Sequence, residues 1–264
     1  MTPRKARHSD GAAGAARRWL HLLDTERRRA AGASTAALRT VRRTLSRRLR
    51  EASRNQVLAL AQLLIQRDAY GDRFLAYELV AAHPATMASL TPREVRRLGR
   101  GLSDWVGVDC FAVYVAGPAW RDGRLPDALI ASWTRASDRW WRRAAVVSTV
   151  PLNLRARGGT GEVGRTLRIA RLARRDRDPM VVKALSWALR ELAKRDPEAV
   201  RRFLDECRDT LPALVRREVS HKLDTGLKQA RRHARGPRTV QPVGPDGVAS
   251  VSQITTGRAR ASST

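Results

Sequence analysis

DPMVVKALSWALRELAK, which spans residues 178–194, predicts a helix that is packed on one side. Asp178 can cap its N-terminus, and Pro179 suits the first helical position, where a missing N–H group costs nothing. Apolar residues then recur at steps of three and four, which is typical of a helix face buried against its neighbours. This apolar stripe consists of Val181, Leu185, Ala188 and Leu192.

The opposite stripe of the same helix combines cations with a large aromatic residue. It consists of Lys183, Trp187, Arg190 and Lys194. A solvated helix face rarely contains a tryptophan, although half-buried packing between helices is an alternative for this residue. We therefore expect the face to meet an anionic partner with a flat or cationic part, and nucleic acid is the first candidate.

The rest of the chain has the pattern of successive helices, without a convincing strand. Thr91 and Glu94 form a capping box around Pro92, which opens one of these helices. Helices of about 12 to 18 residues joined by short turns predict antiparallel pairs stacked as an all-α solenoid. The helices expected beyond residue 90 cover residues 92–98, 104–116, 125–135, 137–152, 163–173, 179–194, 197–207 and 212–232.

The composition divides the chain into three parts. Residues 1–13 predict a disordered basic arm, and a first helix should then run from about Ala15 to Ala31. Residues 14–234 predict the solenoid domain. Residues 235–264 are rich in Gly, Pro, Ser and Thr, which predicts a disordered tail.

The chain is strongly basic, with a formal net charge of +27 at pH 7 and a sequence pI of about 11.7. Most of this charge is arginine, and part of the excess can reflect the base composition of the genome. The charge nevertheless favours phosphate-rich partners, because each neutralised phosphate releases counterions. Residues 34–50 concentrate the charge, and Arg43 and Arg47 either face phosphates or belong to a solvated helix face.

The sequence gives little support to a metal site, a disulfide or a membrane span. Cys110 and Cys207 form no CxxC pair, and the five histidines lack metal-ligand spacing. No apolar run approaches the roughly 20 residues of a membrane span, and the basic N-terminus lacks the apolar core of a secretory signal. We expect a monomeric cytoplasmic protein, associated with the nucleoid, that uses neither a metal nor an organic cofactor.

Three stretches contain the side chains of a candidate site. DWVGVD, residues 104–109, places Trp105 and Asp109 four residues apart, on one face of a helix. DRWWRRA, residues 138–144, places Arg143 one turn beyond Trp140 near a helix start. The third stretch is the helix that contains Trp187.

In this order and at these intervals, the three stretches resemble the alkylpurine DNA glycosylases built from HEAT-like repeats, the DNA alkylation repair family. KALSWALRELAK is the most similar stretch, and DWVGVD, WRRAAVV and RREVSHKL support the resemblance in the correct order. The resemblance extends from about Ala37 to Gln229. It implies a HEAT-like solenoid whose concave face binds duplex DNA that contains alkylated purines.

The family hydrolyses the N-glycosidic bond of cationic N3- or N7-alkylated purines without flipping the base into a pocket. By this resemblance, Trp105 and Trp187 would contact the lesion. Asp109 would be the catalytic carboxylate, and Arg143 would clamp a phosphate near the reacting sugar. A fixed carboxylate suits this reaction because its transition state carries positive charge on the sugar and the base. Additional candidates for contacts with the DNA backbone are Arg142, Lys183, Arg190, Lys194, Arg43 and Arg47.

The residues also allow other interpretations. Asp109 could be a helix-surface acid paired with Arg100 or Arg142, and Arg142 could replace Arg143 as the phosphate ligand. The loop Arg155–Gly161 is longer than the family's usual connection, which leaves the DNA path open. The chain could then bind damaged nucleic acid without cutting it, or act as a protein-interaction scaffold.

Overall fold

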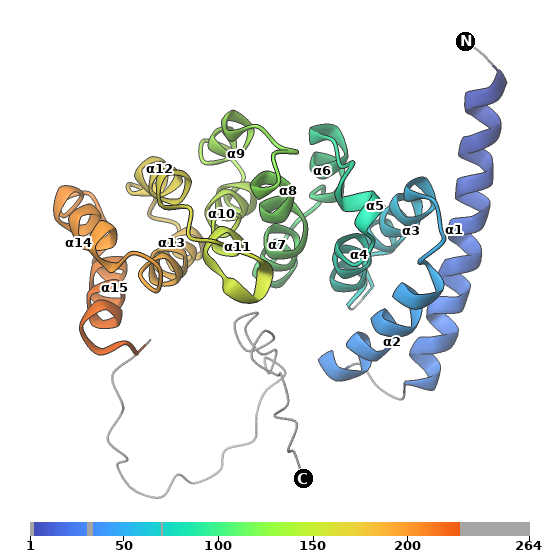
Figure 1. Ribbon diagram of the computed structural model, residues 1–264, viewed down its shortest axis with the longest axis horizontal. Helices are drawn as coiled ribbons and strands as arrows, with labels where there is room; N and C mark the ends of the chain where they lie inside the picture. The colour runs from blue at the N-terminus through green and yellow to red at the C-terminus, as the bar shows by residue number, and fades with distance from the viewer. Residues whose placement is uncertain (1–2, 31–33, 70, 228–264) are drawn as a thin grey trace, which may run out of the picture.

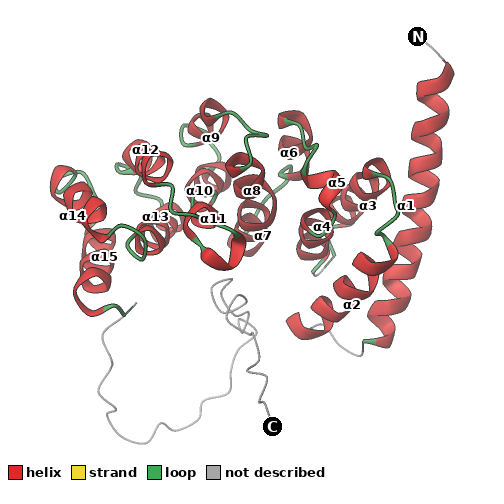
Figure 2. Cartoon of the chain, in the orientation of Figure 1, coloured by secondary structure: helices red, strands yellow, loops and turns green. Residues whose placement is uncertain are grey.

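The computed structural model describes residues 3–30, 34–69 and 71–227, and every element within these ranges is a helix (Figure 2). The helices pack side by side into an arch with an inner and an outer row (Figure 1). Each inner helix contacts the next one along the chain, so the row is continuous from α4 to α15. This architecture confirms the α-solenoid predicted from the sequence.

The inner row contains α4 (Asp72–Ala81), α7 (Trp105–Phe111), α10 (Arg139–Val147), α13 (Pro179–Leu192) and α15 (Ala213–Thr225). The outer row contains α6 (Pro92–Leu98), α9 (Asp127–Trp133), α12 (Val163–Ala173) and α14 (Pro197–Glu206). The N-terminal end of the arch is built from α1 (Pro3–Arg29), α2 (Thr35–Arg48) and α3 (Arg54–Arg67). The short elements are α5 (Pro84–Met87), the π-helical turn η1 (Ala112–Ala116), α8 (Gly117–Arg121), α11 (Val150–Asn153) and the 3₁₀ turn η2 (Arg155–Arg157).

The α13 helix forms for the local reasons that its sequence indicates. The Asp178 carboxylate accepts a hydrogen bond from the Met180 amide at 2.8 Å, and Pro179 occupies the first turn. The four residues of the predicted apolar stripe are all buried. Ala184 and Leu189 are buried as well, because α13 contacts α10, α12 and α15. The helix is therefore enclosed on more sides than a single apolar stripe predicts.

The structure corrects several predicted boundaries, and the helix predicted over residues 137–152 divides into α10 and α11. The first helix begins at Pro3 and not near Ala15, so residues 3–13 are helical where the sequence predicts a disordered arm. The predicted helix 104–116 ends its α-helical part at Phe111 and continues as the π-helical turn η1. The last helix ends at Thr225, and the predicted tail, residues 235–264, lies outside the described residues.

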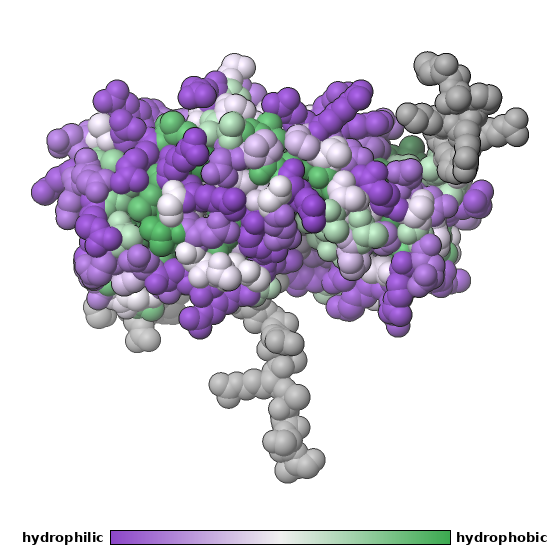
Figure 3. Space-filling view, turned by 45° about the horizontal axis from the view of Figure 1, so that its top comes forward, coloured by the Kyte–Doolittle hydropathy of each residue, from purple (hydrophilic) through white to green (hydrophobic). Residues whose placement is uncertain are grey.

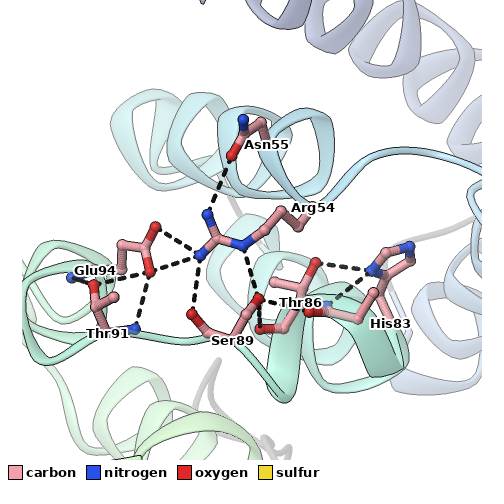
Figure 4. Close-up of polar contacts among 8 residues, drawn as sticks. Arg54, Asn55, His83, Thr86, Ser89, Thr91 and Glu94 are labelled. Carbon is pink, nitrogen blue, oxygen red and sulfur yellow. Dashed lines mark hydrogen bonds and ion pairs between the residues drawn. The ribbon is translucent and has the colours of Figure 1, made fainter.

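The predicted capping box is present and is joined to a neighbouring helix (Figure 4). The Arg54 guanidinium of α3 donates to both carboxylate oxygens of Glu94 at 2.8 Å and to the Ser89 carbonyl at 3.1 Å. Partial burial would raise the pKa of Glu94, but the hydrogen bonds from Thr91 and Arg54 outweigh it and lower the pKa. One carboxylate therefore caps α6 and links it to α3.

A buried charge cluster connects the helices at the N-terminal end. The Asp72 carboxylate of α4 has no solvent exposure and accepts hydrogen bonds from Arg27 of α1 and Arg67 of α3. Arg67 also donates to Asp24 of α1 at 2.8 Å. A buried carboxylate is tolerated only when it is paired in this way, so the cluster fixes α1, α3 and α4 relative to one another.

Apolar side chains are largely enclosed between the two rows. Among the described residues, the large hydrophobic side chains classed as exposed are Leu172 and Leu227. Hydrophilic residues dominate the face in Figure 3, and apolar residues occupy small patches between them. No helix in the described part of the chain has both the length and the apolar character needed to cross a membrane.

Candidate nucleic-acid interface and active site

Asp109 and Arg143, two of the predicted site residues, form a buried ion pair. Arg143 Nε donates to Asp109 Oδ1 at 2.8 Å, and Arg143 Nη2 donates to Oδ2 at 2.7 Å. The third guanidinium nitrogen, Nη1, donates to the carbonyl oxygen of Met180. The pair is therefore bidentate, and every guanidinium nitrogen of Arg143 already has a protein acceptor.

Three consecutive inner helices meet at this pair. Asp109 lies on α7, Arg143 on α10, and Met180 in the first turn of α13. Carboxylates start α7 and α10, because Asp104 accepts from the Gly107 amide at 2.9 Å and Asp138 accepts from the Trp140 amide at 2.8 Å. These N-terminal caps fix where α7 and α10 begin, and so they help to place Asp109 and Arg143 opposite each other.

The pair lies below the protein surface. Asp109 is 2% exposed and Arg143 is 5% exposed. Burial raises the pKa of Asp109, and the adjacent Arg143 guanidinium opposes that rise. Asp109 is thus neither a surface acid nor a partner of Arg100 or Arg142, which the sequence left as alternatives.

The two predicted lesion-contacting tryptophans lie on helices that contribute to the pair. Trp105 is the first residue of α7 and precedes Asp109 by one turn, and its side chain is half-buried. Trp187 is half-buried on α13 and packs partly against the core. Both indoles retain exposed surface on the inner helices.

Three of the predicted backbone-binding cations are held by protein groups. Arg142 Nε donates to Asp176 at 2.7 Å, and Lys194, which lies just beyond the end of α13, pairs with Glu191 of that helix at 2.7 Å. Arg190 differs from its expected outward position, because its side chain is only 12% exposed. It donates to Ser186, whose hydroxyl in turn donates to Glu218 of α15 at 2.6 Å, and burial lowers the pKa of Arg190.

The other three candidates point into solvent. Lys183 on α13 and both Arg43 and Arg47 on α2 are exposed. Arg43 donates to the Thr40 hydroxyl at 3.0 Å, and none of the ion pairs found among the described residues includes these three cations. Of the six cations predicted to contact the DNA backbone, they are the best placed to reach a phosphate without first leaving a carboxylate.

Sequence reasoning missed several partners that decide where these side chains point. Met180 contributes only its backbone carbonyl, which no sequence motif reveals. Glu218 lies within RREVSHKL, one of the stretches that resemble the family, and this position is the sequence feature that could have indicated its role. Asp176 lies just before the cap of α13 and could not be assigned to Arg142 or Arg143 by spacing alone.

The described residues around this pair supply few kinds of chemical group. Within the described residues, no cluster of three or more His, Cys, Asp or Glu side chains could hold a metal ion. Cys110 follows Asp109 but is 1% exposed, and burial raises the pKa of its thiol. A carboxylate–guanidinium pair, two indoles and exposed cations are therefore the available groups.

The fold and these side chains define a basic α-solenoid whose inner helices contain a buried carboxylate–guanidinium pair and two partly exposed indoles. The family described as "DNA alkylation repair enzyme" matches the chain over residues 5–223. The chain belongs to this family, and its role is accordingly that of an enzyme in the repair of alkylated DNA. No curated protein and no solved structure matches the chain closely enough to be compared with it.

Proposed function

We propose that the protein is a DNA glycosylase that hydrolyses the N-glycosidic bond of cationic N3- or N7-alkylated purines in duplex DNA. Family membership supports a DNA substrate that contains alkylated bases. The observation that carries the proposal is the position of the Asp109–Arg143 pair, one helical turn from Trp105 and at the start of the helix that contains Trp187. Carboxylate and indole are the two groups that stabilise cations in this reaction.

The reaction needs little general-acid catalysis. Alkylation has already made the purine cationic, so the bond between C1′ and the base nitrogen breaks with both electrons leaving on the base, which becomes neutral. The sugar then carries oxocarbenium-like positive charge, and water adds to C1′ and loses a proton. Asp109 stabilises the cationic sugar, and it orients that water or accepts its proton.

Arg143 holds Asp109 in the free protein and responds to DNA when it binds. A guanidinium fork matches a phosphate as well as it matches a carboxylate. Movement of the Arg143 fork toward a phosphate would uncover Asp109, and the cationic lesion would then replace Arg143 as its counter-charge. Undamaged DNA has no cationic base to replace Arg143 as the counter-charge of Asp109. Release of Asp109 by Arg143 is therefore favoured where the base is alkylated.

Trp105 and Trp187 supply preference for a charged base. The face of an indole attracts a cation by roughly 0.5–2 kcal/mol, and a neutral purine lacks this attraction. Stacking against partly exposed indoles requires no pocket for a flipped base. The proposal therefore retains duplex DNA as the substrate and excision without base flipping.

The decisive experiment measures release of free 7-methylguanine and 3-methyladenine from methylated duplex DNA. Wild type should release both, and Asp109→Asn should release neither while retaining affinity for the DNA. Asp122→Asn, at an exposed carboxylate on the protein surface, is the matched control and should behave as wild type. Unchanged release by Asp109→Asn would remove this carboxylate from the mechanism.

Asp109→Asn leaves Arg143 buried without its charge partner, which typically costs about 3–5 kcal/mol. The double variant Asp109→Asn/Arg143→Gln removes both charges and retains hydrogen-bonding groups, so it should fold more stably than the single variant. Thermal unfolding of both variants separates loss of the reaction from loss of the fold. A folded double variant that excises bases at the wild-type rate would refute the proposed mechanism.

One observation favours a second candidate function, binding of damaged DNA without cleavage. Both oxygens of Asp109 are engaged by Arg143, and both residues are almost fully buried, as expected for a purely structural pair. Under this alternative, methylated duplex is bound tightly by the wild type and no abasic product forms. The release assay distinguishes the two functions directly.

A further inference from the structure

Arg139 is the arginine of α10 that is least committed to a protein partner. Arg142 and Arg143 each donate to a carboxylate at 2.7 Å. The contact of Arg139 Nη1 with Asp178 is longer, 3.4 Å, and the Arg139 side chain is 54% exposed. Charge-assisted hydrogen bonds between nitrogen and oxygen are usually about 2.7–2.9 Å, so this contact is weak.

The same aspartate already has another role. Asp178 caps α13 by accepting the Met180 amide, and its backbone amide donates to Asp176. Its local bonds do not depend on Arg139. The guanidinium of Arg139 can therefore leave Asp178 without exposing an unpaired buried charge.

Trp140 supports the Arg139 guanidinium from one side. The guanidinium carbon of Arg139 lies 5.6 Å from the centroid of the Trp140 ring, within the range of a cation–π contact. Trp140 is half-buried and packs partly against the core, so the ring is a fixed platform. Its neighbour Trp141 lies in a different environment, because it packs against Trp133 with ring centroids 4.8 Å apart.

α10 lies between the two helices that contain the lesion-contacting tryptophans of the proposed function (Figure 1). Arg139 and Arg143 are four residues apart and share one face of the helix. α10 contacts both α7, which contains Trp105, and α13, which contains Trp187. Packed helices lie about 8–10 Å apart, so DNA that touches both tryptophans must cross α10.

We propose that Arg139, supported by Trp140, is the phosphate ligand that α10 offers to any duplex, in place of Arg142 and without the release of Asp109 that a phosphate contact by Arg143 requires. The inference rests on the proposed function for the DNA path but not for the chemistry. The guanidinium N–H groups of Arg139 can turn toward a phosphate of the DNA backbone, and contact with the Trp140 ring limits their orientations. Arg143 then reaches a phosphate only when it releases Asp109.

The test is the salt dependence of binding to unmodified duplex DNA, which requires no catalysis. Each phosphate contact contributes about 0.9 to the slope of log K against log salt concentration. Arg139→Gln should lower the magnitude of that slope by about 0.9 and weaken binding severalfold at low salt. Arg93→Gln, at an exposed arginine on the outer helix α6, is the matched control and should leave the slope unchanged.

Trp140 is tested as a positioning residue by two substitutions. Trp140→Phe retains an aromatic platform and should keep affinity within about twofold of wild type, whereas Trp140→Leu should weaken binding by about two- to fivefold at a temperature where both variants are folded. Weaker binding by Trp140→Leu but not Trp140→Phe is a pattern that simple packing does not produce. Equal affinities of the two variants would overturn the role of Trp140.

An unchanged slope in Arg139→Gln would overturn the assignment of Arg139. That result is distinct from failure of the proposed glycosylase, which would appear as absence of base release by the wild type. If Arg142→Gln lowers the slope and Arg139→Gln does not, Arg142 is the phosphate ligand. Binding that is insensitive to salt in the wild type would overturn the inference together with the nucleic-acid interface.

Discussion

At the scale of single residues, the carboxylate proposed to act in the reaction and the guanidinium predicted to clamp DNA neutralise each other. Asp109 and Arg143 are 34 residues apart in the sequence, and α7 and α10 bring them together as a bidentate pair. The geometry of the pair depends on the planar fork of arginine, which lysine cannot reproduce. Arg143 is thus a positioning residue for Asp109 in the free protein.

Arg143→Lys should reveal this dependence. The substitution keeps the positive charge but loses at least one of the hydrogen bonds to Asp109, so the free energy of unfolding should fall by about 1–3 kcal/mol. Release of 7-methylguanine should slow by about tenfold or more, because the carboxylate is no longer held in one orientation. Denaturant unfolding and single-turnover excision measure the two effects, with Arg142→Lys as the neighbouring control. Wild-type excision by Arg143→Lys would show that charge alone suffices.

At the scale of elements, single side chains connect helices that are distant in sequence. Asp72 joins α4 to α1 and α3, and Glu94 caps α6 while it binds Arg54 of α3. The solenoid thus has polar links between its elements in addition to apolar packing. These links join α1, α3, α4 and α6, and α2 packs against α1 and α4.

The Glu94 link should give the stability of the protein a measurable pH dependence. Its pKa is lowered on folding, so the carboxylate stabilises the folded protein above its unfolded pKa of about 4.3. This stabilisation is lost as the pH falls through the lower folded value. Glu94→Gln should therefore cost about 1 kcal/mol at pH 7 and progressively less below pH 4 or so.

Urea unfolding of wild type and Glu94→Gln between pH 7 and pH 3 measures that difference. Glu198→Gln is the control, because the Glu198 side chain is 67% exposed and pairs with Arg201 on its own helix. Its effect should stay within a few tenths of a kcal/mol. A Glu94→Gln difference that persists undiminished to pH 3 would show that the charge of Glu94 is not its source.

At the scale of the whole molecule, the exposed cations are spread along the arch. Lys183 and the proposed phosphate ligand Arg139 lie on central inner helices, whereas Arg43 and Arg47 lie on α2 at the N-terminal end (Figure 1). A duplex that reaches both regions must follow much of the inner row. The length of DNA needed for full affinity therefore reports how much of the arch is used.

Arg43→Gln/Arg47→Gln should distinguish a DNA contact from a solvated helix face. If α2 contacts the backbone, the slope of log K against log salt concentration should fall by up to about 1.8 on a long duplex. The same variant should bind a short duplex, which covers only α7 to α13, with wild-type affinity. Equal slopes for wild type and variant on the long duplex would assign the charge of α2 to solubility.

The sequence predicted the elements better than the directions of their side chains. The helix Val163–Ala173 and the capping box at Thr91 depend on local periodicity and turn chemistry, and both are confirmed. Arg142 and Arg143 could not be told apart, because they differ only by one helical step. Their partners, Asp176 and Asp109, lie on other elements, so tertiary packing decides which arginine is buried.

The candidate site could therefore be proposed from the sequence as a set of residues, but its contacts could not be predicted. Trp105, Asp109 and Arg143 were selected by motif, and the structure adds that the last two bind each other. The burial of Arg190 was not foreseen, because Ser186 and Glu218 approach it from α13 and α15. The periodicity of one helix does not reveal which of its residues a neighbouring helix covers.

The mutual neutralisation of Asp109 and Arg143 also constrains how this chain can diverge. A lone buried guanidinium costs several kcal/mol, so loss of the carboxylate creates pressure to replace the arginine, and the reverse holds equally. The two positions should consequently vary together among relatives, either as an acid with an arginine or as two uncharged residues. Descendants that abandon excision but keep binding DNA should be recognisable by the simultaneous loss of both charges.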